Sequence, residues 1–141
     1  MKRKGSAVWQ GTLREGAGTV STESGVLANS PYSFGTRFGD ARGTNPEELV
    51  AAAHAGCFSM ALSVILGEAG LTATTIATTA TATLEKTDAG FTVTAIHLDV
   101  AATVPGTDAA AFDALAAKAK ADCPISRLLN ATITMTATLG G

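Results

Sequence analysis

Two cysteines and one nearby histidine are the side chains whose spacing could support chemistry. The only thiols in the sequence are Cys57 and Cys123, and a thiolate can act as a nucleophile or bind a metal. His54 precedes Cys57 by three residues, so the two side chains share a face if the segment is helical. Three functions are open: thiol catalysis, a metal site of Cys57, His54 and Cys123 with His97 more distant, or a dimeric carrier with inert buried thiols.

A reactive Cys57 needs a positive charge beside it. The pKa of a free thiol is about 8.5, and burial raises it further. The dipole of a helix acts on its first and last turns, so a cysteine in the middle gains little from it. Lowering the pKa by two units takes about 2.7 kcal/mol, which a hydrogen-bonded arginine can supply. The arginines nearest in sequence to the helix or to Cys123 are Arg37, Arg42 and Arg127.

Residues 45–70, NPEELVAAAHAGCFSMALSVILGEAG, predict a long helix around which the chain is organised. Asn45 suits the N-cap, Pro46 the first helical position, and Glu48 can complete a capping box. Beyond the first turn no face is charged, which predicts a helix buried on all sides. At 1.5 Å per residue it would run roughly 36 Å. That length suggests that a second subunit helps to cover the helix.

The remaining patterns predict sheet and two further helices. Alternation predicts strands at residues 6–14, 19–21, 32–38, 76–84, 91–104 and 131–139. The apolar phase slips near Ala95 and Ile96, which suggests a bulge or a strand covered on both faces. A helix capped by Thr107 or Asp108 and running to about residue 121, and a short helix from Pro124, carry Cys123 between them, facing inward. We expect one α+β domain over residues 1–141, with antiparallel sheet packed around the central helix.

Composition excludes several classes of protein. A net charge of -2 and a pI near 5.6 give no reason to expect nucleic acid or an anionic membrane as partner. The basic start is followed by no apolar stretch of a signal peptide. His54 and flanking glutamates weaken a transmembrane interpretation of the central helix. Without a secretory signal we expect a cytoplasmic protein, in which a catalytic thiol is favoured over a structural disulfide, and we expect neither metal nor cofactor.

The chain closely resembles the OsmC branch of the OsmC/Ohr family over essentially its whole length. Three runs carry the resemblance: WQGTLREGAGTVSTESG, TRFGDARGTNPEELVAAAHAGCFSMALS and ADCPIS. The resemblance implies a thiol-dependent peroxidase that reduces organic hydroperoxides, and hydrogen peroxide less efficiently. It also implies an OsmC-like fold, an intertwined homodimer with active sites at the subunit interface, and an external dithiol as reductant, for which the family suggests lipoylated proteins.

The resemblance also implies roles for individual residues. Cys57 matches the peroxidatic cysteine and Cys123 the resolving cysteine. Arg37 matches the arginine that holds the thiolate, and Glu47 matches the glutamate that orients this arginine. Glu48 is adjacent to Glu47 and is a supporting candidate, although its capping position already explains it. The family usually has alanine where Gly56 precedes the reactive cysteine, a departure that removes no functional group.

Helix geometry adds a constraint to these roles. Glu47 and Cys57 are ten residues apart on one predicted helix, which is about 15 Å along a straight axis. One arginine side chain does not bridge that gap within a single helix. We therefore expect Glu47, together with Arg37, to approach Cys57 from the partner subunit.

Four further residues have two interpretations each. Phe38, Phe58 and Met60 could line an apolar pocket for hydrophobic peroxides, but core packing is the alternative, and we favour it for Phe58 and Met60. His54 could act as a base for Cys57. A single histidine on an apolar helix is more often a hydrogen-bonded core residue.

Overall fold

The computed structural model describes residues 1–140. Its contacts divide the chain into two compact units, Met1–Leu49 and Val50–Gly141. Each unit has its own sheet of three strands. A single OsmC-like domain over residues 1–141 stays a prediction.

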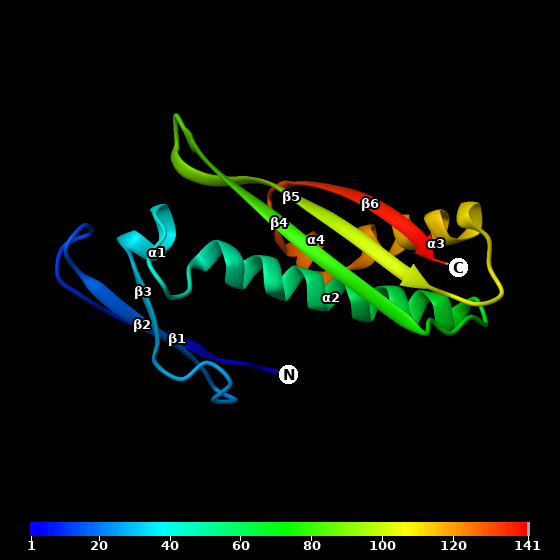
Figure 1. Ribbon diagram of the computed structural model, residues 1–141, viewed down its shortest axis with the longest axis horizontal. Coiled ribbons are helices and arrows are strands. Elements are labelled where there is room, and N and C mark those ends of the chain that lie inside the picture. Colours follow the sequence, from blue (N-terminus) through cyan, green and yellow to red (C-terminus); the bar gives the residue numbers. More distant parts are fainter. Residues whose placement is uncertain (141) are drawn as a thin grey trace. The chain divides into compact units, whose positions relative to one another are not determined.

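The N-terminal unit is a small antiparallel sheet followed by one turn of helix. Strands β1 (Gly5–Gln10), β2 (Ala17–Thr22) and β3 (Ser30–Ser33) pair in that order, and helix α1 (Phe34–Phe38) follows directly (Figure 1). Gly18 lies between Trp9 and Tyr32 in the strand register. A side chain at this glycine would begin 2.6 Å from the Tyr32 ring and 2.9 Å from the Trp9 ring, so the aromatic pair needs glycine there.

The predicted strand at residues 32–38 is wrong beyond Ser33, because the chain turns into α1 at Phe34. A capping box explains the change. The Ser33 hydroxyl accepts the backbone N–H of Thr36, and the Thr36 hydroxyl accepts the backbone N–H of Ser33 at 2.8 Å. The alternating aromatics Phe34 and Phe38 therefore become neighbours one helical turn apart, with ring centroids separated by 4.8 Å.

The C-terminal unit contains most of helix α2 (Pro46–Glu68), a long sheet and two further helices. Its strands are β4 (Thr75–Thr87), β5 (Gly90–Thr103) and β6 (Thr132–Gly140), and its helices α3 (Ala109–Asp122) and α4 (Pro124–Leu128) lie between β5 and β6 in sequence. The three strands lie side by side along α2 (Figure 1). Completely buried residues from α2, β5 and α3, among them Phe58, Ile96 and Phe112, form one hydrophobic core.

The sheet of this unit is not wholly antiparallel, which corrects the predicted antiparallel arrangement. β4 and β5 form an antiparallel hairpin, whereas β6 pairs parallel to β5, with Ile96 opposite Ile133. The reason is the connection between them. A chain that leaves β5, passes through α3 and α4 and returns in β6 is a crossover, and a crossover through helices joins parallel strands.

The predicted irregularity in the second long strand is confirmed as a β-bulge. Thr83 pairs with Ala95, but the next residue, Leu84, pairs with Val93, so Thr94 is the extra residue on β5. An extra residue shifts the two-residue alternation by one position. That shift is why the apolar phase slips there, and beyond it Ile96 and Leu98 point into the core.

The sequence predicted that the long helix is buried on all sides. Within this single chain, α2 is buried along one face only. The buried face consists of His54, Phe58, Leu62, Ile65 and Leu66. On other faces Met60 is 74% exposed and Val64 is 61% exposed. These apolar residues are the kind that a second subunit would cover, so the exposure is compatible with the homodimer prediction.

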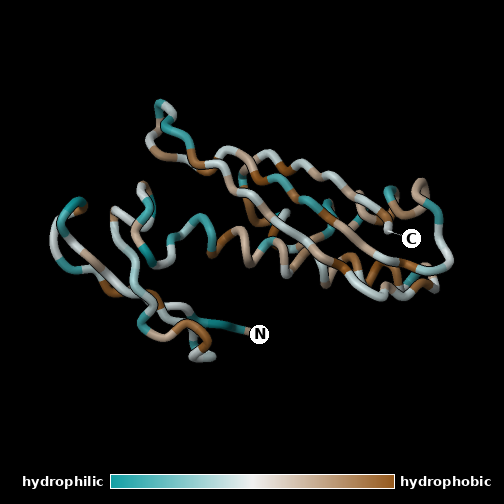
Figure 2. The backbone as a smooth tube through the Cα atoms, in the orientation of Figure 1, coloured by the Kyte–Doolittle hydropathy of each residue, from teal (hydrophilic) through white to brown (hydrophobic). Residues whose placement is uncertain are grey.

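The hydropathy of α2 changes after its first turn. The tube is teal at the first turn and mostly pale to brown beyond it (Figure 2). By length and composition alone α2 would also suit a membrane span. Its buried face instead contributes Phe58, Leu62 and Leu66 to the core of the C-terminal unit, as a core helix does.

Replacing Phe58 by alanine tests whether this residue belongs to the core or to a pocket. Because its side chain is completely buried, we expect Phe58→Ala to lower the free energy of unfolding by about 3–5 kcal/mol. Urea unfolding at fixed protein concentration measures the change. Val26, which is 85% exposed, provides the control, and Val26→Ala should change stability by about 0.5 kcal/mol or less. A loss of the same small size for Phe58→Ala would contradict the core assignment.

Candidate active site

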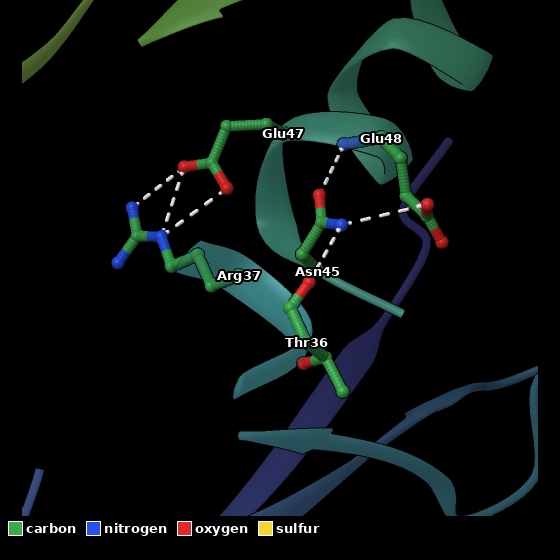
Figure 3. Close-up of polar contacts among 5 residues, drawn as sticks. All are labelled: Thr36, Arg37, Asn45, Glu47 and Glu48. Atoms are coloured by element: carbon green, nitrogen blue, oxygen red, sulfur yellow. Dashed lines mark hydrogen bonds and ion pairs between the residues drawn. The ribbon is translucent and has the colours of Figure 1, made fainter. Parts of the chain in front are cut away.

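An arginine–glutamate ion pair joins α1 to the first turn of α2 in the N-terminal unit. Arg37, in α1, donates from Nε to Oε1 and Oε2 of Glu47 at 3.1 and 3.2 Å, and from Nη2 to Oε1 at 2.6 Å (Figure 3). The guanidinium also lies over the Phe38 ring, 5.3 Å from its centroid. The third nitrogen, Nη1, lies on the side away from Glu47 (Figure 3). Glu47 therefore fixes the guanidinium plane while leaving donors for another group.

The start of α2 positions this pair. Asn45 Oδ1 accepts the backbone N–H of Glu48 at 2.8 Å, which confirms Asn45 as the N-cap. Asn45 Nδ2 also donates to the carbonyl of Thr36 at 3.2 Å and so ties α1 to the first turn of α2 (Figure 3). The Glu48 carboxylate accepts from the Thr44 hydroxyl at 2.6 Å. Glu48 thus supports the turn, whereas Glu47 is the carboxylate that reaches Arg37.

A pocket of about 290 Å³ opens beside Arg37. Most of its lining is apolar or aromatic. The residues that line it are Trp9, Leu13, Tyr32, Ser33, Phe34, Arg37, Phe38 and Pro46. Such a concave apolar surface with one fixed cation suits a small hydrophobic molecule with a polar end.

Of the predicted pocket residues, only Phe38 lines this pocket. Phe58 is completely buried in the core, and Met60 is 74% exposed on α2. No sequence pattern marked Trp9, Tyr32 or Phe34 as pocket residues. Trp9 and Tyr32 both lie opposite Gly18 on neighbouring strands, but this relation can be recognised only when the strand register is known.

The two thiols meet in the C-terminal unit. Cys57 is partly buried in the middle of α2, and Cys123 is completely buried at the junction of α3 and α4. Both are free thiols. The Cys123 side chain lies within hydrogen-bonding reach of the Cys57 thiol, and so does the backbone N–H of Ile125, in the first turn of α4. Residues far apart in sequence therefore place two sulfur atoms within reach of each other.

The environment within the chain keeps Cys57 protonated. Burial is the largest influence and raises the pKa of the Cys57 thiol, and the neighbouring Cys123 raises it as well. The Ile125 N–H acts in the opposite direction and lowers this pKa. None of these influences is a positive charge. The arrangement agrees with the sequence argument that a reactive Cys57 requires a cation.

His54 is a buried, hydrogen-bonded residue one turn before Cys57. Its Nε2 lies 2.7 Å from the Ser126 hydroxyl in α4. Its Nδ1 is buried without a hydrogen-bond partner among residues 1–140. Burial lowers the pKa of His54 below its ordinary value of 6.5, so the imidazole is neutral. These contacts fit the core interpretation of His54 better than a role as base for Cys57.

Within residues 1–140, no three of the histidine, cysteine, aspartate and glutamate side chains cluster closely enough to hold a metal ion. His97, the distant candidate, lies on β5 with Nδ1 2.5 Å from the Thr134 hydroxyl.

Comparison with known proteins gives consistent matches. Residues 39–138 match the family described as OsmC-like protein. The chain is 59% identical over 133 residues to Peroxiredoxin OsmC of Escherichia coli, covering 94% of this chain and 93% of the relative. The fold is similar to the organic hydroperoxide resistance protein OhrB of Bacillus subtilis, with a TM-score of 0.69 at 22% identity over 97% of this chain and 98% of the other. An OsmC-like protein of unknown function from Vibrio cholerae gives a TM-score of 0.77 at 16% identity, covering 98% and 99%.

These matches assign the chain to the thiol-based oxidoreductases of the peroxiredoxin class. It belongs to the OsmC-like family, with the family match crossing the boundary between the two units. The α+β, OsmC-like fold predicted from the sequence is thereby confirmed.

The buried imidazole predicts a pH dependence of stability. Below its ordinary pKa the unfolded chain takes up a proton at His54, whereas the folded chain resists it. The stability due to the neutral form is therefore present above pH 6.5 and is lost as pH falls through and below that value. Urea unfolding at pH 7.5 and 5.5 measures the loss, and it should be smaller in His54→Gln. An equal loss in both proteins would contradict the prediction.

Proposed function

We propose that this chain reduces organic hydroperoxides to alcohols, with Cys57 as the peroxidatic and Cys123 as the resolving cysteine. The observation that carries the proposal is the proximity of the two free thiols, since the Cys123 side chain lies within hydrogen-bonding reach of Cys57. Membership of a peroxidase family supplies the chemistry that such a pair performs. The alternative, a carrier with inert thiols, gives no reason for Cys57 to lie beside Cys123.

The proposed cycle begins with ionisation of Cys57. Arg37 stabilises the thiolate, and Glu47 holds the guanidinium plane through its bidentate bond. Burial alone raises the pKa of Cys57, so this arginine would supply the missing positive charge. The ten-residue spacing of Glu47 and Cys57 along the helix motivates a dimeric site, in which Arg37 and Glu47 act on Cys57 of a second copy.

The chemical steps follow from the thiolate. Its sulfur attacks the distal oxygen of ROOH and breaks the O–O bond; with uptake of one proton, ROH leaves and Cys57 becomes a sulfenic acid. The Cys123 thiol then attacks this sulfur. The S–S bond forms, the S–O bond breaks, and the oxygen leaves as water with the thiol proton. An external dithiol reduces the disulfide and is itself oxidised, and lipoylated proteins are the reductants that the resemblance suggests.

The apolar pocket beside Arg37 supports a hydrophobic substrate. Aromatic walls from Trp9, Tyr32 and Phe34 would hold the organic group of the peroxide, while the guanidinium faces its polar end. Hydrogen peroxide has no organic group to bury there, so we expect it to react more slowly. A cytoplasmic location, where thiols are kept reduced, suits a cycle that depends on an external dithiol.

Mass spectrometry after addition of cumene hydroperoxide tests the chemistry. With less than one equivalent of peroxide we expect both thiols to disappear in equal amounts and the oxidised protein to lose the mass of two hydrogens. Cys123→Ser should instead retain one oxygen on Cys57, because the resolving thiol is missing. Unchanged mass and slow thiol labelling in the wild-type protein would favour the inert carrier.

Mixed dimers test whether the site is shared between two chains. We expect Arg37→Ala and Cys57→Ser each to abolish most peroxide consumption on its own. A mixture of the two, refolded together, should regain activity, because one chain then supplies Arg37 and the other Cys57. Arg42→Ala, which changes an exposed arginine nearby, is the control and should keep full activity. No recovery in the mixture, with dimers present, would contradict a shared site.

A further inference from the structure

Helix α4 brings three groups to the same face of α2. Cys123 is its N-cap, and Ile125 and Ser126 lie in its first turn. Cys123 and the Ile125 N–H both act on the Cys57 sulfur, and the Ser126 hydroxyl lies 2.7 Å from His54 Nε2. His54 and Cys57, being three residues apart on α2, share the helix face that receives them. One short helix is thus attached to α2 at two successive turns.

Packing alone holds α4 only weakly. None of the residues of α4 itself is buried, and Leu128 is 73% exposed. Ile125 is partly buried against the core. Among residues 1–140, the bond between His54 and Ser126 is the one hydrogen bond between a side chain of α4 and a side chain of α2. Together with the Ile125 N–H beside Cys57, it constrains the direction of this helix.

Stability does not explain why a histidine occupies position 54. The side chain is completely buried, and its Nδ1 is left without a partner. A buried polar atom without a hydrogen bond opposes folding, and an apolar residue of similar volume would avoid that cost. What an apolar residue would lack is the bond to Ser126.

We propose that His54, through its hydrogen bond to Ser126, is a positioning residue for disulfide formation, because it holds α4 so that Cys123 stays against Cys57. The inference rests on the proposed function and concerns its second chemical step. When the Cys123 thiol attacks the Cys57 sulfenic acid, the S–S bond forms and water leaves. The two sulfur atoms must close to about 2.05 Å, so a small displacement of α4 slows this step strongly.

A loosened α4 also has a second chemical consequence. The sulfenic acid on Cys57 either condenses with Cys123 or reacts with another peroxide molecule to give a sulfinic acid, with ROH as the other product. Slower condensation shifts this competition towards the sulfinic acid. The ratio of disulfide to sulfinic acid therefore reports the position of Cys123, which a purely structural role of His54 would not change.

The test compares four variants in a single turnover with cumene hydroperoxide. In Ser126→Ala and His54→Leu we expect disulfide formation to slow by about tenfold, with peroxide consumption slowed by no more than about threefold. Mass spectrometry at rising peroxide should show more sulfinic acid than in the wild type. His54→Gln, which keeps a hydrogen-bonding group near the position of Nε2, should restore much of the disulfide rate. Ser59→Ala is the matched control, because it removes a 2.8 Å bond from α2 to Thr78 of β4 and leaves α4 untouched.

The outcomes separate this inference from the proposed function. If the wild-type protein forms no disulfide with peroxide, the proposed function fails. If the wild type forms it and Ser126→Ala forms it at the same rate with the same product ratio, the positioning role alone is refuted. The role is also refuted if Ser59→Ala shifts the product ratio as much as Ser126→Ala, because general loosening of the fold would then explain both. Thermal unfolding of each variant confirms that folded proteins are compared.

Discussion

The proximity of the Cys57 sulfur to the first turn of α4 is the constraint on which the proposed chemistry depends. It joins the middle of α2 to the end of α3 through Cys123 and the Ile125 N–H. Burial raises the pKa of Cys57, so the same enclosure that brings the sulfur atoms together also suppresses ionisation. A reactive thiol in such an enclosure needs a neighbouring positive charge, and in the proposed function Arg37, held by Glu47, supplies it.

The arginine–glutamate pair and the two thiols are positioned by different kinds of interaction. In the N-terminal unit, capping interactions at Ser33 and Asn45 place Arg37 and Glu47 within one short stretch of chain. In the C-terminal unit, long-range packing of α2 against the sheet and α3 brings Cys57 to Cys123. Local interactions fix the cation, and the hydrophobic core fixes the thiols. The apolar residues left exposed on α2, such as Met60, are surface on which two such chains could associate.

Sequence reasoning was most reliable where strong local signals agreed. Asn45 and Pro46 correctly predicted the start of α2, and the phase slip near Ala95 correctly indicated the bulge at Thr94. It failed where a short-range bond overrode periodicity, as at Ser33, whose capping box converts alternating aromatics into a helix. The pairing of Cys57 with Cys123 came from the family resemblance. Ser126 and the Ile125 N–H were missed because a backbone donor and a serine in a short helix carry no pattern of their own.

The parallel pairing of β5 with β6 places Cys123 inside a crossover connection, and this has a consequence for the growing chain. A nascent polypeptide exposes Cys57 well before Cys123 emerges, and parallel pairing between strands distant in sequence forms slowly. Until β6 joins the sheet, the packing around the junction of α3 and α4 beside the first thiol is incomplete. During synthesis the proposed peroxidatic sulfur therefore passes through an interval in which oxidation has no intramolecular remedy, and the small thiolate fraction of a thiol without a neighbouring arginine would protect it during that interval.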